Sequence, residues 1–346
     1  NANAVASNTV TMSVDTVVPT IAIGSNKASL KAGETATVTF TFSEDPSTTF
    51  SWTGTSGDVV VSGGALGVIS GTGLTRTATF TPTAGSTANG VVSVASNTFT
   101  DAAGNANAVA SNTVTMRVDT VVPTIAIASS KGSLKAGETA TLTFTLSELA
   151  TGFVASDVTV SGGALSAFAG NGTSYTATFT PDVSSTTSGV VSVSSGKFTD
   201  AAGNTNSAAS NTVTMSVDTV VPTVSISSNK TSLKAGAGET ATLTFAFSET
   251  PIGFDATDLT VTGGSISNLA AVNGTSSYTA TFTPTAGSTA NGVVSVASGT
   301  FTDAALNQNA DGSDTNNTVT MSVDTVVPTI AIGSNKASLK AGETAT

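Results

Sequence analysis

The sequence predicts an all-β fold, organised as a tandem array of antiparallel β-sandwich domains. The first observation behind this prediction is a repeat: VDTVVPT starts at Val14, Val118, Val217 and Val323, so one unit is about 100 residues long. Such a unit is longer than a solenoid repeat and long enough to fold by itself. The second observation is that Thr, Ser, Ala, Val and Gly dominate, which favours strands and turns over helices. The third is a two-residue alternation of apolar and polar side chains, typical of strands with one buried face.

The alternation is clearest in the second repeat. Residues 139–146 (TATLTFTL) and 174–180 (SYTATFT) each place their apolar side chains on one face and threonines on the other. Further strands are predicted at residues 123–127, 157–161, 164–169, 190–193 and 211–217. Seven short strands separated by Gly, Asn, Asp and Pro turns match an immunoglobulin-like sandwich. The predicted core phenylalanines are Phe144, Phe179 and Phe198, with Phe42, Phe80 and Phe99 as their counterparts in the first repeat.

The repeats also give the domain boundaries. KAGET recurs at Lys31, Lys135 and Lys340, and an inserted Ala-Gly makes it KAGAGET from Lys234. Both ends of the sequence fall inside a unit, so we expect the native chain to continue in both directions. The Pro-containing segment after each VDT is expected to be a short, stiff linker. The predicted units are the tail of a repeat at 1–13, whole repeats at 14–117, 118–216 and 217–322, and the head of a repeat at 323–346.

Composition excludes several function classes. The chain has 346 residues, no Cys and no His, which removes disulfides, thiol and imidazole catalysis and the usual zinc ligands. Its net charge of −11 argues against nucleic-acid binding, which needs basic patches. No apolar run approaches the roughly 20 residues of a membrane span. Acidic residues that recur in every repeat are not expected of a single catalytic cleft, so we do not expect an enzyme.

Four motifs in each repeat carry a resemblance to a known family. They are VDTVVPTIAI, an FSE-type strand end, DVTVSGG and FTDAAGN, each with small variations between repeats, and the likeness covers essentially the whole chain. As a set they resemble the bacterial Ig-like repeats of giant surface adhesins and biofilm-associated proteins. The resemblance implies a tandem, extracellular, often calcium-binding stalk on the bacterial cell surface.

The acidic residues of each repeat are predicted to meet at one pole of the sandwich. If consecutive strands alternate in direction, the linker Asp, the Glu that ends the second strand, the Asp that starts the third and the Asp of FTDAAGN all reach the same end. Clustered carboxylates repel one another unless a cation lies among them, and hard oxygen ligands suit Ca²⁺ better than Mg²⁺. We therefore expect Ca²⁺ to be bound by Asp15, Glu44, Asp58, Asp101 and Asn105; by Asp119, Glu148, Asp157, Asp200 and Asn204; by Asp218, Glu249, Asp258, Asp303 and Asn307; and by Asp324.

The third repeat departs from this pattern. Leu306 stands where the other repeats have Gly, and a longer loop adds Asp311 and Asp314. A different site geometry or a second ion is expected there. Lys27, Lys31 and their counterparts are flanked by Ser, Gly and Ala, and we expect them to be solvated.

The function predicted from these observations is a structural extender that holds a binding module away from the cell. Its partners would be neighbouring repeats of the same chain, with other copies if the chain forms a fibre. Two alternatives stay open. One is a subunit of a self-assembling extracellular filament or sheath. The other is a module that binds carbohydrate or a host protein, for which the first repeat's distinct segment from Phe50 to Gly57 would be the candidate surface.

Overall fold

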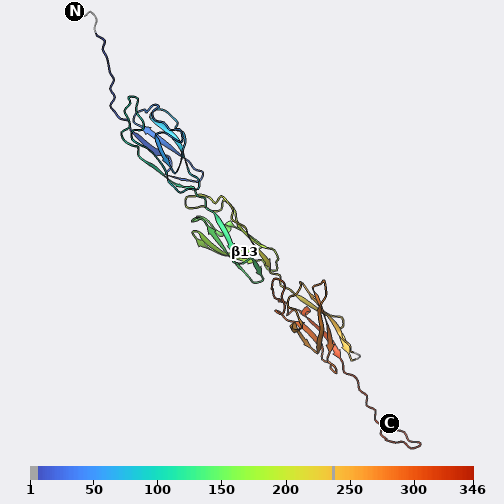
Figure 1. Ribbon diagram of the computed structural model, residues 1–346. Coiled ribbons are helices and arrows are strands. Elements are labelled where there is room, and N and C mark those ends of the chain that lie inside the picture. Colours follow the sequence, from blue (N-terminus) through green and yellow to red (C-terminus); the bar gives the residue numbers. More distant parts are fainter. Residues whose placement is uncertain (1–6, 236–237) are drawn as a thin grey trace, which may run out of the picture.

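The computed structural model describes residues 7–235 and 238–346, which form three β-sandwich domains joined end to end (Figure 1). An extended segment precedes the first domain and another follows the third. Helix in the described residues is confined to three short 3₁₀ helices: η1 (Ala155–Asp157), η2 (Ala256–Asp258) and η3 (Thr315–Asn317). The predicted all-β fold class is confirmed.

The strands of the three domains correspond one to one. The first domain contains β1 (Ile21–Ser25), β2 (Ser29–Lys31), β3 (Ala36–Phe42), β4 (Val59–Ser62), β5 (Gly64–Leu66), β6 (Thr75–Pro82), β7 (Gly90–Val94) and β8 (Val114–Asp119). The second contains β9 (Ile125–Ser129), β10 (Ser133–Lys135), β11 (Ala140–Leu146), β12 (Val158–Ser161), β13 (Gly163–Asn171), β14 (Ser174–Pro181), β15 (Gly189–Val193) and β16 (Val213–Asp218). The third contains β17 (Val224–Ser228), β18 (Ser232–Lys234), β19 (Ala241–Phe247), β20 (Leu259–Thr262), β21 (Gly264–Ala271), β22 (Ser277–Pro284), β23 (Gly292–Val296) and β24 (Thr318–Asp324).

Each domain is a sandwich of two four-stranded sheets. In the second domain one sheet has the order β13-β14-β11-β9 and the other β10-β16-β15-β12, and the same orders recur in the other two domains. The pairs between described strands are antiparallel except for β2 with β8, β10 with β16 and β18 with β24, which are parallel. This is an immunoglobulin-like arrangement. The prediction of seven strands omitted the second one, SLK, because three residues are too few to show an alternation.

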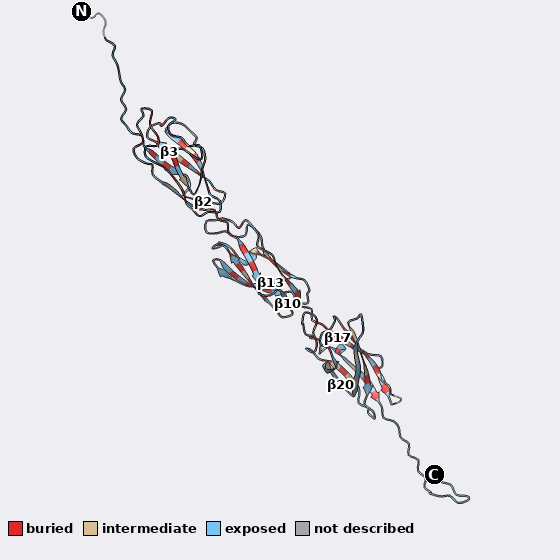
Figure 2. Ribbon diagram, in the orientation of Figure 1, coloured by how far each residue is buried: buried red, intermediate tan, exposed pale blue. Residues whose placement is uncertain are grey.

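The inward side chains of both sheets form one core in each domain (Figure 2). Phe144 and Phe179 are fully buried, and Phe198 packs with them. The counterpart of Phe144 in the first domain is Phe40 rather than the predicted Phe42, because β3 (ATVTFTF) and β11 (ATLTFTL) align from their first residues. Phe42 is also buried, at the position that Leu146 and Phe247 occupy in the other domains.

Two glycines in each domain lie against a core phenylalanine ring. A Cβ added to Gly163 or Gly189 would lie 2.6 or 2.5 Å from Cζ of Phe179, which is closer than real Cβ contacts come. The same glycines of the first domain, Gly64 and Gly90, lie equally close to Phe80. This packing explains why the second glycine of the SGG motif, which is TGG in the third repeat, and the glycine before VVSV recur in every repeat.

The linkers are short and anchored at both ends. The last strand of the first domain runs to Asp119, two residues past the predicted boundary after residue 117. Thr120 is buried against its own domain, where its Oγ1 donates to the carbonyl oxygen of Thr83 over 2.6 Å. Thr124 already belongs to the next domain, since its N–H donates to Oγ of Ser147. Only the VVP tripeptide lies between these two anchors, which supports the predicted stiffness of the linker.

Some predicted segments lie partly outside the described residues. In the predicted fragment 1–13, residues 1–6 are not described. The Ala-Gly insertion after Lys234 overlaps residues 236–237, which are not described either. In the fragment 323–346, Val323 and Asp324 complete β24 of the third domain, and no strand is formed by residues 325–346.

Candidate metal centres at the domain junctions

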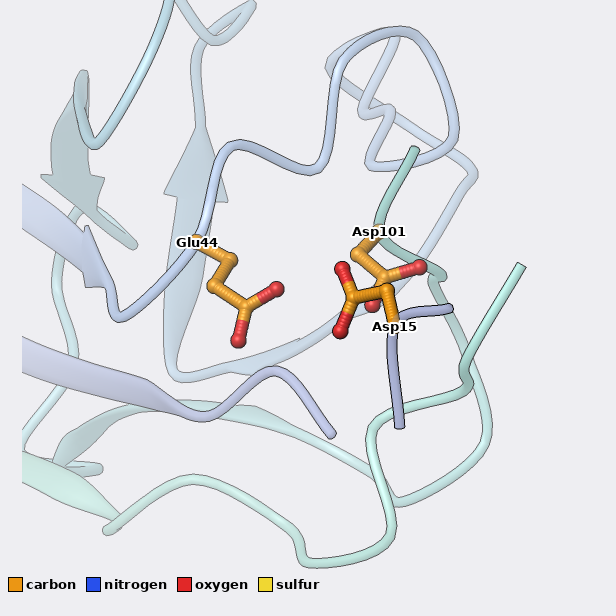
Figure 3. Close-up of side chains that lie close together, drawn as sticks. All are labelled: Asp15, Glu44 and Asp101. Atoms are coloured by element: carbon orange, nitrogen blue, oxygen red, sulfur yellow. The ribbon is translucent and has the colours of Figure 1, made fainter. Parts of the chain in front are cut away.

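Three acidic triads lie at the poles where the linkers enter the domains. In each triad, one carboxylate oxygen from every residue lies within 4.8 Å of the other two. Figure 3 shows the first triad, in which Asp15 and Asp101 lie together and Glu44 extends toward them. The triads are Asp15–Glu44–Asp101, Asp119–Glu148–Asp200 and Asp218–Glu249–Asp303.

The members of a triad come from both sides of a linker. Asp119 is the last residue of β8 in the first domain, whereas Glu148 follows β11 and Asp200 lies in the β15–β16 loop of the second. Asp218, at the end of β16, has the same relation to Glu249 and Asp303 of the third domain. The pole predicted from strand direction is therefore where these three kinds of acid meet.

The FTDAAGN motif folds into a tight turn that fixes its aspartate. In the second domain the carboxylate of Asp200 accepts the backbone N–H of Asn204 over 2.8 Å and its side-chain Nδ2 over 2.7 Å. Gly203 closes the turn by donating its N–H to the carbonyl oxygen of Asp200, with a φ of 86° that favours glycine. Asp200 is consequently buried and oriented before any ligand binds.

In the second and third triads, the glutamate has a buried carboxylate oxygen that no hydrogen-bond donor satisfies. Oε1 of Glu148 and Oε1 of Glu249 are buried and have no hydrogen-bond partner. Burial raises the pKa of Glu148, and the charges of Asp119 and Asp200 raise it further. Glu249 and Glu44 have their pKa values raised by the same causes, burial first and then the neighbouring aspartates. Burial would also raise the pKa of Asp101, but hydrogen bonds from Asn105, Ala103 and Gly104 outweigh it and lower that pKa.

The chemistry of this donor set fits a hard divalent cation. Three carboxylates offer up to six oxygens within a small volume, and an orphaned buried carboxylate oxygen is costly unless a positive group satisfies it. With three acids and no neutralising lysine or arginine in the triad, a divalent ion would cancel most of the local charge.

The asparagines predicted as ligands face the triads with nitrogen rather than oxygen. Nδ2 of Asn204 donates to Asp200 and to the carbonyl oxygen of Asp119, whereas its Oδ1 accepts the N–H of Ala32 from the preceding domain. Asn307 has the same arrangement, and Nδ2 of Asn105 likewise points to the acids. An amide N–H cannot ligate a metal, so the expected oxygen ligands are not presented by these three residues.

Asp58, Asp157 and Asp258 lie outside the triads, contrary to the prediction that the start of the third long strand would join them. Their carboxylates accept backbone N–H groups a few residues earlier, from Ser51, Val154 and Asp255. Such local turn formation competes with any distant ligand. Asp324 ends β24 and joins no triad among the described residues.

The third domain forms its triad despite the altered loop. Leu306 adopts a φ of 68°, in the left-handed region where Gly104 and Gly203 stand in the other domains. Asp311 is buried, and its carboxylate accepts the N–H of Val224, which ties the longer loop to β17. No second acidic group that could hold an ion is formed by Asp311 or Asp314 within the described part of the chain.

Two lysines that the sequence led us to expect in solvent instead cross the junctions. Nζ of Lys31 donates to the carbonyl oxygen of Gly203 over 2.9 Å, and Nζ of Lys135 to that of Leu306 over 3.0 Å. The recurrence of KAGET was the available signal, but nothing in the sequence gave the position of the next domain's loop. Lys27 forms an ion pair with Glu34 at 3.3 Å.

Comparison with known proteins gives a family match along the chain. A family model described as a bacterial Ig-like domain matches residues 15–118, 119–217 and 218–320. No curated protein shows significant similarity.

Solved structures with a similar fold include two bacterial proteins and a fragment of titin. FdeC, an adhesin of Escherichia coli, is 18% identical over 88% of this chain and 96% of that one, with a TM-score of 0.30. Invasin, a bacterial integrin-binding protein, is 15% identical over 89% of this chain and 60% of that one, with a TM-score of 0.35. The I67–I69 fragment of titin is 9% identical over 90% and 99%, with a TM-score of 0.39. At these identities the likeness concerns the fold alone.

Proposed function

The chain belongs to the bacterial Ig-like domain family, and on this premise we propose that it is a stalk segment of a bacterial surface adhesin, stiffened by calcium at its domain junctions. The stalk would hold a binding module away from the cell. In the described residues, no helix is long and apolar enough to cross a bilayer.

The observation that carries the proposal is that the second and third triads each draw on two domains. Asp119 ends the last strand of one domain, and Glu148 and Asp200 belong to the next. A cation held by all three would therefore restrain the angle between the domains as well as neutralise the charge. The VVP linker adds to this restraint, because few backbone torsions are left free between its anchors.

Calcium is the cation that the site favours. Its flexible coordination by six to eight oxygens tolerates three carboxylates completed by water or backbone oxygens, whereas Mg²⁺ requires octahedral geometry and keeps its own waters. The unpartnered Oε1 atoms of Glu148 and Glu249 supply ligand atoms that lose nothing on binding.

A recognition role finds less support. The loop of the first domain that differs from its counterparts, from Phe50 to Gly57, is fixed by contacts within its own domain: Phe50 is buried, and the indole N–H of Trp52 donates to the carbonyl oxygen of Leu66. Buried Arg76, at the position of Tyr175 in the second domain, donates to the carbonyl oxygen of Phe50. These contacts account for the loop's distinct residues by packing.

Calorimetric titration and small-angle scattering of the chain test the proposal together. Calcium at millimolar concentration should be taken up by chelator-treated protein, and chelation should shorten the mean end-to-end length. Glu148→Gln should remove one site and loosen only the junction between the first and second domains, and Glu249→Gln only the next junction. No calcium uptake, with scattering unchanged by chelator, would refute calcium stiffening. Concentration-dependent polymers in sedimentation experiments would favour the filament alternative.

A further inference from the structure

Beside the second and third acidic triads, a backbone turn of one domain is hydrogen-bonded to a loop of the next domain. The turn that follows β2 offers two donors to the second domain: Nζ of Lys31 binds the carbonyl oxygen of Gly203, and the N–H of Ala32 binds Oδ1 of Asn204 over 2.7 Å. At the next junction Lys135 and Ala136 make the same two contacts with Leu306 and Asn307, the latter again over 2.7 Å.

The asparagine side chain completes a sheet ladder that belongs to the other domain. β2 and β8 are parallel neighbours, with Lys31 opposite Asp119. Asn204 accepts from Ala32, the residue after β2, and donates Nδ2 to the carbonyl oxygen of Asp119, the last residue of β8, over 2.9 Å. Its carboxamide therefore occupies the next rung of the ladder, with one acceptor and one donor in a plane as a peptide group has.

The third domain presents the same two backbone groups bonded to each other. There the N–H of Ala235 donates directly to the carbonyl oxygen of Asp324 over 2.7 Å. In the first domain the corresponding pair, Ala32 and Asp119, is separated by the inserted carboxamide. The end of this ladder thus exists in a closed form and in a form opened by an asparagine.

The loop asparagine is fully buried only in the domains where it contacts the preceding domain. Asn204 and Asn307, whose oxygens receive an N–H from the preceding domain, are each 2% exposed. Asn105, which has the same turn around it but no such donor among the described residues, is half-buried. A buried amide needs partners for its oxygen and its nitrogen, so removing one of them destabilises the docked arrangement.

We propose that the end of the parallel strand pair in each domain is a socket for a carboxamide, and that the Asn of the next repeat's FTDxxxN loop is its plug. The plug sets the rotation of one domain on the next without any metal ion. It is separate from the calcium proposal, because none of the socket's atoms is a carboxylate oxygen.

The turn offers a substitution that removes the socket's donor and leaves the turn intact. The turn consists of the four residues Lys31–Glu34. The N–H of Glu34 closes it by donating to the carbonyl oxygen of Lys31, and Gly33 has a φ of 77°. In a turn with a glycine at positive φ in its third position, Pro is favoured in the second, where Ala32 stands. Ala32→Pro therefore deletes the N–H that binds Asn204 and places the ring Cδ where the carboxamide oxygen lies, so Asn204 cannot keep its position, while no residue of the second domain is changed.

The experiment measures distances between spin labels in the whole chain in excess chelator. Because the chain has no Cys, introduced cysteines are the only sites that a thiol-reactive spin label can modify. The labels are attached at three exposed threonines in equivalent strand positions, through Thr81→Cys, Thr180→Cys and Thr283→Cys. Ala32→Pro should raise the undocked fraction in the 81–180 distance distribution at least about tenfold, because it removes one hydrogen bond, strands its partner and displaces the carboxamide oxygen. The 180–283 distribution should not change, and Ala136→Pro should give the reverse.

Two matched variants keep the test decisive. Ala341→Pro lies in a turn with the same KAGET sequence and glycine φ but no interdomain contact in the described chain, so it should change neither distribution. Glu148→Gln should also change neither in chelator, which separates the socket from calcium binding. If Ala32→Pro leaves the 81–180 distribution as it is in the parent chain while the first domain stays folded, the socket proposal is wrong.

Discussion

Replacement of Glu148 by Gln should change the stability of the second domain in opposite directions with and without calcium. Without metal, the two neighbouring carboxylates, with oxygens up to 4.8 Å away, repel Glu148. At the dielectric constant of water each pair costs about 1 kcal/mol, which is a lower bound here because Glu148 is half-buried and its Oε1 is shielded from solvent. Since its unpartnered Oε1 makes no hydrogen bond that Gln would lose, Glu148→Gln should stabilise the metal-free domain by about 1–2 kcal/mol.

With calcium the order should reverse. At a hundredfold excess over its dissociation constant, an ion bound only by the folded state stabilises by about 2.7 kcal/mol. The Gln variant would lose most of that gain and should be about 1 kcal/mol less stable than the parent chain. Differential scanning calorimetry in chelator and in calcium measures both comparisons.

The control is Asp157→Asn, which removes the same charge outside the triad. Its effect should be the same in both buffers, because the Asp157 carboxylate is engaged by the N–H of Val154. A calcium response that survives Glu148→Gln but disappears with Asp157→Asn would refute the triad and restore Asp157 as a ligand.

Three further outcomes are expected. In chelator, acidification from pH 7 toward 4.5, the ordinary pKa of Glu148, should stabilise the second domain, because the raised pKa of this carboxyl lets the folded state bind a proton at a higher pH than the unfolded state does. The added stabilisation by calcium should fall over the same range. Calorimetric scans at several pH values measure both effects. Phe144→Ala should cost about 3–5 kcal/mol and the exposed Thr145→Ala under about 1 kcal/mol in denaturant melts, and equal costs would contradict the strand register. Leu306→Gly should stabilise the third domain by up to about 1 kcal/mol, whereas Gly203→Leu should destabilise the second by about 1–2 kcal/mol. If denaturant melts gave changes in unfolding free energy of the same sign for the two variants, the left-handed backbone at this turn would carry no strain.

The sequence was sufficient for the strands whose side chains alternate and for the pole at which the acids meet. β11 and β14 have long alternating patterns, so their faces could be predicted from local sequence. β10 could not, because its three residues are stabilised by a parallel partner more than 80 residues away in the chain. The Glu and the loop Asp follow elements whose direction is set by simple alternation, which is why their convergence could be predicted.

Where the structure departs from the predicted ligand sets, the difference lies in side-chain direction rather than in position. Asp157 lies near the correct pole, but the backbone N–H of Val154 is closer and takes its carboxylate. Asn204 lies beside the triad, yet its orientation depends on Ala32 and Asp119 of another domain. Sequence patterns indicate which residues share an end of a sandwich, but hydrogen bonds to groups distant in sequence decide where each polar atom points.

The parallel pairing of β2 with β8 has a mechanical consequence. β2 lies near the start of the first domain and β8 is its last strand, as β10 and β16 or β18 and β24 are in the other two, so a pull on the two ends of the array draws these neighbours in opposite directions along their length. The hydrogen bonds between them are then loaded in shear and must fail together, whereas a hairpin pulled from its open end breaks one bond at a time. The three-residue ladder between β2 (Ser29–Lys31) and β8 is therefore where resistance to extension should concentrate, and force spectroscopy would register the rupture of this ladder and its counterparts as the first barrier to unfolding of each domain.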